Sequence, residues 1–284
     1  MSLGLLPDDE SDRRLVKHVH PPDWINPQPT GKYNLVVIGA GTAGLVSAAG
    51  GAGLGAKVAL VERHLLGGDC LNVGCVPSKG ILRSAKFVGE LARAGDLGMV
   101  VAGVQPDFAK VMQRVRRLRA EISPNDSVER FSKLGVDVYL GQGKFVSPTE
   151  LEVDGRRLRF SKAIIATGAR AHVPAVAGLS EARPLTNENV FNLTELPGRL
   201  AVLGGGPIGA ELSQAFARLG STVTLVEKGK RILPREEEDA ALIVQRSLER
   251  SGVNVWTESS LQSVDGAGHE KRLTIDQGGK QTNL

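Results

Sequence analysis

The chain has 284 residues, of which 41% are hydrophobic and 23% are charged. This length and composition are typical of a globular protein with about two domains, and they exclude a disordered tail or a coiled coil. The net charge of +4 is too small to indicate a nucleic-acid partner.

Residues 1–31 are polar and rich in proline, and we expect them to wrap around a domain or to stay loose. His18 and His20 are the only two histidines of this segment, and two histidines without further ligands do not make a metal site, so no metal is expected. The segment has neither the basic start nor the apolar run of a secretion signal, which predicts a cytoplasmic protein.

An internal repeat is the strongest signal in the chain. Residues Leu35–Glu62 and Leu200–Glu227 align with each other without a gap. Each copy predicts a strand, a glycine turn, a helix and a second strand that ends in an acid. Residues Leu35–Ala56 are uncharged and long enough for a membrane span, but their seven glycines are spaced as in a strand, turn and helix, so no span is expected.

Each repeat carries a GxGxxG pattern in the context that gives it a physical meaning. The first glycine permits a tight turn, the second lets a pyrophosphate approach the helix N-terminus, and the third allows close packing of helix on strand. The acid at the end of the second strand is placed to accept hydrogen bonds from a ribose. We therefore predict two dinucleotide sites. The first is formed by Gly39, Ala40, Gly41, Thr42, Ala43, Gly44, Glu62 and Arg63, and the second by Gly204, Gly206, Pro207, Ile208, Gly209 and Glu227.

The choice between NADH and NADPH depends on charge at the second site. Glu227 repels a 2′-phosphate and favours NADH. Three cations that follow it (Lys228, Lys230 and Arg231) favour NADPH. NADH is the expected cofactor.

The segments between and after the repeats predict an α/β fold. Residues 81–94 and 108–134 have helical periodicity, and Pro124 should break the second helix. Four arginines in this second helix are expected to form a solvated face; they are Arg114, Arg116, Arg117 and Arg119. Residues 136–167 predict short strands. A further helix at 238–251, a strand at 253–257 and short strands over 261–284 are also expected.

Cys70 and Cys75 are the only cysteines, and they lie together in the segment GGDCLNVGCVPSK. Five residues of regular helix rise about 7.5 Å, so a disulfide between them needs a distorted turn, which Gly74 permits. Pro77 suits a first helical turn, which puts Cys75 at a helix N-terminus and favours its thiolate. Redox chemistry explains this pair better than a structural role.

This cysteine motif between two GxGxxG units resembles that of the flavin-dependent pyridine nucleotide–disulfide oxidoreductases, such as dihydrolipoamide dehydrogenase, glutathione reductase and mercuric reductase. The Gly68-Asp69-Cys70 variant and the WINP segment look most like bacterial mercuric-reductase-like members. The resemblance implies two Rossmann-like three-layer domains with a β-meander in each. The expected division is an extension over 1–31, an incomplete FAD-binding domain over 32–178 and a truncated NAD(P)-binding domain over 179–284.

The resemblance also implies site roles. Cys75 is expected as the charge-transfer thiol against the flavin and Cys70 as the interchange thiol that meets substrate. Lys79 should lie near the flavin N5 edge and pair with Glu211, because a cation there stabilises the reduced flavin. The remaining FAD contacts are expected from Gly68, Asp69, Gly143, Ala166, Thr167 and Gly168. Asp69 departs from the commoner threonine of the family.

The implied reaction passes electrons from NAD(P)H to FAD, then to Cys70–Cys75, and finally to a small disulfide or a metal ion. The reverse direction oxidises a dithiol, as in dihydrolipoamide dehydrogenase. Two alternatives are a non-catalytic FAD-binding fragment and a flavin monooxygenase, which has no use for the cysteine loop. Family members are homodimers that run well beyond the length of this chain and end in an interface domain, so we expect a truncated chain without that domain.

Overall fold

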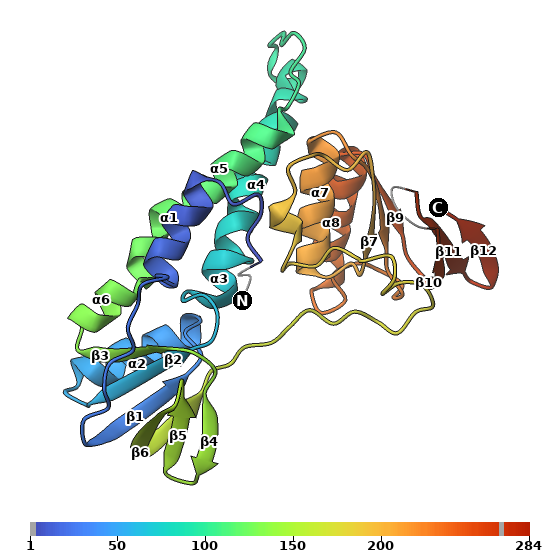
Figure 1. Ribbon diagram of the computed structural model, residues 1–284. Coiled ribbons are helices and arrows are strands. Elements are labelled where there is room, and N and C mark those ends of the chain that lie inside the picture. Colours follow the sequence, from blue (N-terminus) through green and yellow to red (C-terminus); the bar gives the residue numbers. More distant parts are fainter. Residues whose placement is uncertain (1–3, 267–269) are drawn as a thin grey trace. The chain divides into compact units, whose positions relative to one another are not determined.

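The computed structural model describes residues 4–266 and 270–284. The chain divides into two compact units (Figure 1). The first consists of Met1–Pro77 with Gln113–Arg170, and the second of Ser78–Met112 with Ala171–Leu284. Residues 78–112, which the sequence assigns to the FAD-binding domain, therefore group with the second unit. Both units contain parallel strands connected by helices, which confirms the predicted α/β fold.

The first unit is built on one six-stranded sheet in the order β3-β2-β1-β6-β5-β4. Its strands are β1 (Lys32–Ile38), β2 (Val58–Glu62), β3 (Val136–Leu140), β4 (Lys144–Ser147), β5 (Glu150–Val153) and β6 (Arg156–Ile165). Strands β3, β2, β1 and β6 are parallel, whereas β4, β5 and β6 form an antiparallel meander. The meander confirms the prediction for this half of the chain.

Both faces of the parallel strands are covered. Val37 and Leu60 belong to a core that includes residues of α2 (Thr42–Gly53), while their neighbours Val36 and Val61 belong to a second core with the meander. All five residues of β2 are buried. A strand that is covered on both faces has apolar residues at successive positions and no alternation with polar ones. This explains the sequence VALV before Glu62.

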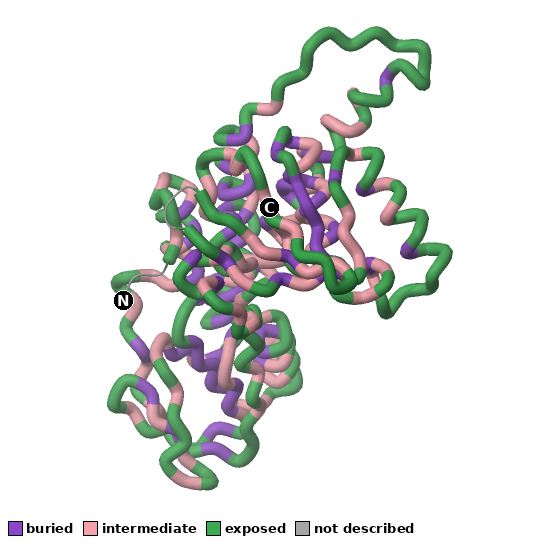
Figure 2. The backbone as a smooth tube through the Cα atoms, turned by 90° about the vertical axis from the view of Figure 1, so that its right-hand side faces the viewer, coloured by how far each residue is buried: buried purple, intermediate pink, exposed green. Residues whose placement is uncertain are grey.

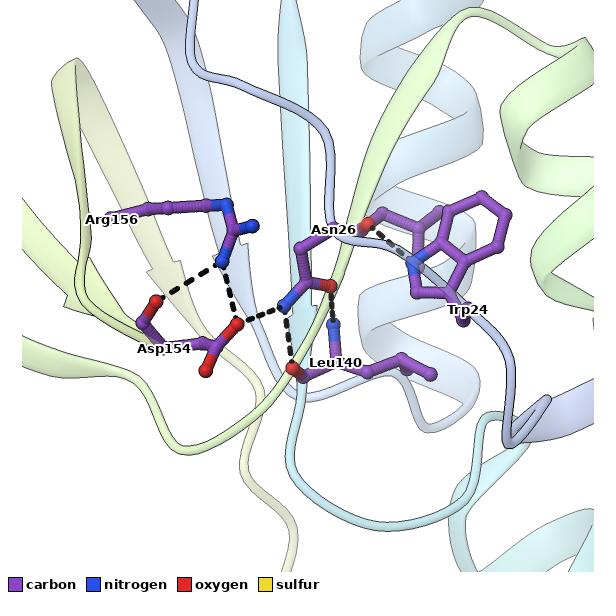
Figure 3. A network of polar contacts seen from close by, with 6 residues as sticks. Trp24, Asn26, Leu140, Asp154 and Arg156 are labelled. Atoms are coloured by element: carbon purple, nitrogen blue, oxygen red, sulfur yellow. Dashed lines mark hydrogen bonds and ion pairs between the residues drawn. The ribbon is translucent and has the colours of Figure 1, made fainter.

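Residues 10–26 pack on the rest of the first unit. Helix α1 (Glu10–Val19) is capped by Asp9, whose side chain accepts from the amide of Asp12. After α1 the chain runs along the edge strand β3, where the Trp24 indole donates to Val138 O (Figure 3). The Asn26 amide bonds both the N–H and the C=O of Leu140, at 2.7 and 2.9 Å. This segment therefore satisfies polar groups that an edge strand otherwise exposes.

Further helices complete the first unit or link it to the second. They are α3 (Gly68–Asn72), α4 (Cys75–Leu91), η1 (Ala94–Leu97), α5 (Phe108–Ile122), η2 (Ser123–Asp126) and α6 (Val128–Lys133). The break between α5 and η2 confirms the predicted effect of Pro124. Residues 95–105 are all exposed and form the long green segment at the top of Figure 2.

The second unit repeats the pattern on a smaller scale. Three parallel strands have the order β7-β8-β9, and an antiparallel meander has the order β10-β11-β12. The elements are η3 (Val190–Asn192), β7 (Arg199–Leu203), α7 (Pro207–Arg218), β8 (Thr222–Val226), α8 (Glu238–Arg250), β9 (Val253–Trp256), β10 (Ser259–Asp265), β11 (Arg272–Gln277) and β12 (Lys280–Asn283). This unit also confirms the predicted meander. None of the helices in the described parts of the chain has the length and apolar character needed to cross a bilayer.

Candidate functional site

The first glycine turn joins β1 to α2. Gly39 has φ +98°, and a Cβ there would lie 2.2 Å from the carbonyl oxygen of Ala166. Gly41 is the N-cap of α2 and offers no side chain to the N–H groups of the first turn. The N–H groups at this helix N-terminus thus have no side-chain cap and can bond an anionic group.

Glu62 stabilises this turn through hydrogen bonds to both of its carboxylate oxygens. Its Oε2 accepts from the Ala40 amide at 2.7 Å, and its Oε1 accepts from the His64 amide at 2.7 Å. The side chain is nearly buried at the end of β2. Because a carboxylate has about four acceptor positions, two remain for further donors such as ribose hydroxyls.

The second glycine turn has the same bonds at the corresponding positions of the repeat. Glu227 Oε2 accepts from the Gly205 amide at 2.6 Å, and Oε1 accepts from the Gly229 amide at 2.7 Å. Gly204 has φ +103°, close to the value of Gly39. The internal repeat therefore extends from the glycines to the hydrogen bonds that hold them.

The second unit has a cavity beside its glycine turn. The volume is about 210 Å³, and the lining includes Gly204, Glu227, Lys228, Ser259 and Leu261. A Cβ on Gly206, at the N-cap of α7, would meet nothing within 4 Å. The space in front of this turn can therefore take a ligand.

A larger cavity of about 370 Å³ lies in the first unit, and its lining includes none of the predicted site residues. The N-terminal segment and the β3 edge form it, and its lining includes His20, Trp24, Asn26, Asp154 and Arg156. Figure 3 shows Asn26 pointing towards Asp154, with Arg156 on the other side of that carboxylate.

The cysteine loop has the distorted turn that the sequence requires. Cys70 lies in α3, which ends at Asn72, and Cys75 is the first residue of α4. A Cβ on the intervening Gly74 would lie 2.7 Å from the Asp69 carbonyl oxygen, so only glycine fits without a shift. Cys75 thus begins a helix of 17 residues, which is the helix start that Pro77 predicts.

The two thiols interact with each other and with the first glycine turn. Burial raises the pKa of the Cys70 thiol, and a hydrogen bond with Cys75 raises it further. A bond with the hydroxyl of Thr42 acts in the opposite direction, while the carboxylate of Asp126 again raises the pKa. Thr42 is the first residue of α2, so Cys70 lies at the turn that the sequence assigns to a nucleotide. Cys75 is exposed.

The loop also packs directly on that turn. Gly68 has φ +54°, and a Cβ there would lie 2.5 Å from the Cα of Gly41. The backbone of the cysteine loop and the backbone of the turn therefore approach as closely as two glycines allow.

Lys79 and Glu211 form the ion pair that the resemblance implies. The distance from Lys79 Nζ to Glu211 Oε2 is 3.0 Å, and 63% and 43% of the two side chains are exposed. Lys79 lies on α4, one helical turn after Cys75, and Glu211 lies on α7. An exposed pair of this kind stabilises a fold little, so its position matters more than its strength.

The other predicted contacts are placed as follows. Ala166 and Thr167 lie against Gly39, and a Cβ on Gly143 would lie 3.3 Å from a methyl group of Val61. Several predicted residues are exposed: Thr42, Ala43, Arg63, Asp69, Thr167, Gly168, Pro207 and Ile208.

The expectation of a solvated arginine face is wrong for two of the four arginines. Arg116 pairs with Asp9 at 2.6 Å and is 5% exposed, and Arg119 pairs with Asp12 at 2.9 Å and is fully buried. Burial lowers the pKa of Arg119, while Asp12 opposes this shift. Both acids lie at the start of the N-terminal helix α1, about 100 residues before the two arginines in the sequence. No local sequence pattern therefore predicts these ion pairs.

The two N-terminal histidines have partners within the first unit. His18 Nδ1 lies 2.7 Å from Ser123 Oγ, and His20 Nδ1 bonds the carbonyl oxygen of His64. Within residues 4–266 and 270–284, no three His, Cys, Asp or Glu side chains gather in a way that could hold a metal ion.

Comparisons with known proteins show the family of the chain. The family described as pyridine nucleotide-disulphide oxidoreductase matches residues 33–283. The chain is 34% identical to a dihydrolipoyl dehydrogenase of Acholeplasma laidlawii, over 89% of this chain and 75% of that protein. It is 33% identical to a mercuric reductase of Bacillus cereus, over 90% of this chain and 41% of that protein.

A solved structure is similar as well. The flavoprotein disulfide reductase RclA from Escherichia coli, described as HOCl-induced, aligns with a TM-score of 0.74 and 30% identity. The alignment covers 88% of this chain and 54% of that one. The chain thus spans about half the length of RclA and of the mercuric reductase, and three quarters of the Acholeplasma protein.

Proposed function

Because the chain belongs to the pyridine nucleotide–disulphide oxidoreductase family, we propose that it carries electrons from NAD(P)H through FAD to the Cys70–Cys75 pair. The observation that supports this proposal is the packing of the cysteine loop on the first glycine turn, where a Cβ on Gly68 would lie only 2.5 Å from the Cα of Gly41. In the whole protein the pair reduces a small disulfide or a metal ion, or in the reverse direction accepts electrons from a dithiol.

The first unit fits FAD. Gly41 leaves the N-terminus of α2 without a side-chain cap, which suits a pyrophosphate, and Glu62 keeps acceptor positions for a ribose. Gly68, Asp69, Gly143 and the segment 166–168 are proposed as further contacts. When bound, FAD supplies the group that takes two electrons from the nicotinamide and gives them to a disulfide.

The second unit fits a pyridine nucleotide. Its cavity adjoins Gly204 and Glu227, and the proposed contacts also include Gly206, Pro207, Ile208 and Gly209. Glu227 carries negative charge where the 2′-phosphate of NADPH would lie, so we propose NADH. This reducing cofactor is supplied in the cytoplasm, which is the compartment we propose.

The chain's own residues perform the thiol chemistry. The disulfide form of the pair takes up two electrons and two protons to give two thiols. The Cys70 thiolate then attacks one sulfur of a substrate disulfide and releases the other as a thiol. Cys75 attacks the mixed disulfide, which restores the Cys70–Cys75 bond and frees the second thiol. Lys79 supplies positive charge where reduction leaves negative charge, and Glu211 holds it in position.

The test is an anaerobic titration of the FAD-loaded protein with NADH. The proposal predicts a long-wavelength absorption band from the Cys75 thiolate beside the flavin. A Cys70→Ser variant should show the band without NADH, because its Cys75 cannot form the disulfide. A Cys75→Ser variant should never show it, and a band in that variant would contradict the assigned roles.

A second candidate function rests on the fraction of the relatives' length that the chain spans, which is 41% for the mercuric reductase. In this alternative the chain binds FAD but does not turn over substrate. Consumption of NADH that depends on a disulfide acceptor distinguishes the two. Full activity in the Cys75→Ser variant would instead favour a flavin monooxygenase.

We propose that the whole protein is a homodimer. Sedimentation of the protein made from the complete reading frame tests this proposal.

A further inference from the structure

Arg119 connects the N-terminal helix to the cysteine loop. Its Nη2 donates to Asp12 Oδ1 at 2.9 Å, and its Nη1 donates to the carbonyl oxygen of Asn72 at 2.9 Å. Both charged side chains are 1% exposed. One planar guanidinium therefore bonds two segments that are far apart in the sequence, a geometry that lysine cannot reproduce.

Asn72 is the point where this connection reaches the redox pair. It is the last residue of α3, and it lies between the two cysteines in sequence. Its own amide donates to the carbonyl oxygens of Leu66 and Gly68 at 3.0 and 2.9 Å. Gly68 in turn packs on Gly41. The contacts thus run without interruption from α1 to the turn that bends the cysteine loop and to the first glycine turn.

A buried ion pair is a costly way to attach a helix. Removing two charges from water opposes folding, and apolar residues of similar volume attach helices equally well. Between the same two helices, Asp9 and Arg116 form a second ion pair, yet Arg116 has no bond to the cysteine loop among the described residues. The bond to Asn72 is therefore what distinguishes the inner pair from the outer pair.

We propose that Asp12 and Arg119 are positioning residues for the Cys70–Cys75 couple. Asp12 holds the guanidinium, the guanidinium holds the carbonyl of Asn72, and the fixed turn keeps the two sulfurs close enough to form a disulfide. The proposal rests on the redox function proposed above. A looser turn lowers the effective concentration of one thiol at the other, which shifts the couple towards the dithiol and makes its reduction potential less negative.

The experiment equilibrates the chain with glutathione buffers and measures the dithiol fraction by alkylation of Cys70 and Cys75. The reaction is protein dithiol plus oxidised glutathione, giving protein disulfide plus two reduced glutathiones, and it needs neither flavin nor NADH. Asp12→Asn and Arg119→Gln should each lower the equilibrium constant about tenfold, which corresponds to about 30 mV for two electrons. The double variant D12L/R119M removes both charges at similar volume, so a folded protein without the bond to Asn72 can also be measured.

The matched control is D9N/R116M, which removes the outer pair. Asparagine at position 9 keeps the N-cap of α1, so the helix itself is retained. The control should keep the wild-type potential. An unchanged potential in folded D12L/R119M would overturn the proposal, as would an equal shift in the control. If wild-type Cys70 and Cys75 form no disulfide in any buffer, the proposed function itself fails, which is a different result from equal potentials.

Discussion

Glu62 and Glu227 occupy the same position in the two copies of the repeat and accept hydrogen bonds from corresponding pairs of backbone amides. Glu62 bonds Ala40 and His64, and Glu227 bonds Gly205 and Gly229, all at 2.6–2.7 Å. Each acid therefore shapes its glycine turn as well as offering acceptors to a ribose. Because each glycine turn has its own acid, we predict that a change to one acid weakens the binding of one cofactor and not of the other.

Replacing each acid by glutamine tests this independence. Glutamine keeps one acceptor, so one backbone amide faces an amide donor instead of an oxygen. The loss of a charge-assisted bond, about 1.5–3 kcal/mol, corresponds to about a tenfold or greater loss of affinity. Glu62→Gln should weaken FAD and spare NADH, and Glu227→Gln should do the reverse, as measured by fluorescence titration of each cofactor. A loss of both cofactors in either variant would contradict independent sites.

The third glycine of the first turn predicts a stability effect. A Cβ on Gly44 would lie 1.8 Å from the Gly39 carbonyl oxygen, whereas a Cβ on Gly50 of the same helix would meet nothing within 4 Å. Gly44→Ala should lower the free energy of unfolding by about 1–3 kcal/mol or more. Gly50→Ala should raise it by up to about 1 kcal/mol, because alanine favours a helix. Urea denaturation of both variants gives the comparison, and equal stabilities would show that the turn relaxes around the methyl group.

The Lys79–Glu211 pair predicts a kinetic effect without a stability effect. Since both side chains are largely exposed, Lys79→Met and Glu211→Gln should change the free energy of unfolding by less than about 1 kcal/mol. Both should slow the NADH-dependent reduction of the cysteine pair about tenfold or more in stopped-flow experiments. The control is the exposed pair Lys86–Glu90 on the same helix, whose replacement should leave the rate unchanged. A wild-type rate in both Lys79→Met and Glu211→Gln would remove the pair from the proposed reaction.

Cys70 predicts a pH dependence in the reduced protein. Burial, the bond with Cys75 and the Asp126 carboxylate raise the pKa of Cys70, so the thiol stays protonated to a higher pH than an ordinary cysteine. Its alkylation by iodoacetamide should therefore accelerate only above the pH at which a free cysteine reacts. Cys75→Ala and Asp126→Asn each remove a cause of the shift and should move the reaction midpoint to lower pH. A midpoint that stays in place in both variants would contradict this account of the thiol's surroundings.

The sequence predicts the features that depend on local patterns. The glycine turns, the strands on either side of them, and the break before Cys75 all follow from residue spacing and from the steric limits of glycine and proline. The Lys79–Glu211 pair came from the resemblance to a family, because no local rule joins two positions so distant in the sequence. These features account for most of the parallel sheets and for the candidate site around the cysteines.

The burial of Arg116 and Arg119 could not be predicted in the same way. Their charge and helical spacing are those of a solvated face, and only the folded N-terminal helix supplies Asp9 and Asp12 as partners. The hydrogen bonds from Glu62 and Glu227 to the backbone of the glycine turns could not be predicted either. In the sequence, a carboxylate at the end of a strand indicates a ligand contact, and only the folded structure shows which backbone amides lie near it.

The most direct test of the central claim counts thiols after one addition of NADH. The FAD-loaded protein is oxidised, made anaerobic, mixed with one equivalent of NADH and alkylated, and the label at Cys70 and Cys75 is read by mass spectrometry. We predict that both cysteines become labelled, with one NADH consumed per cysteine pair. If NADH is consumed while both cysteines remain unlabelled, the electrons do not reach the pair and the account is wrong.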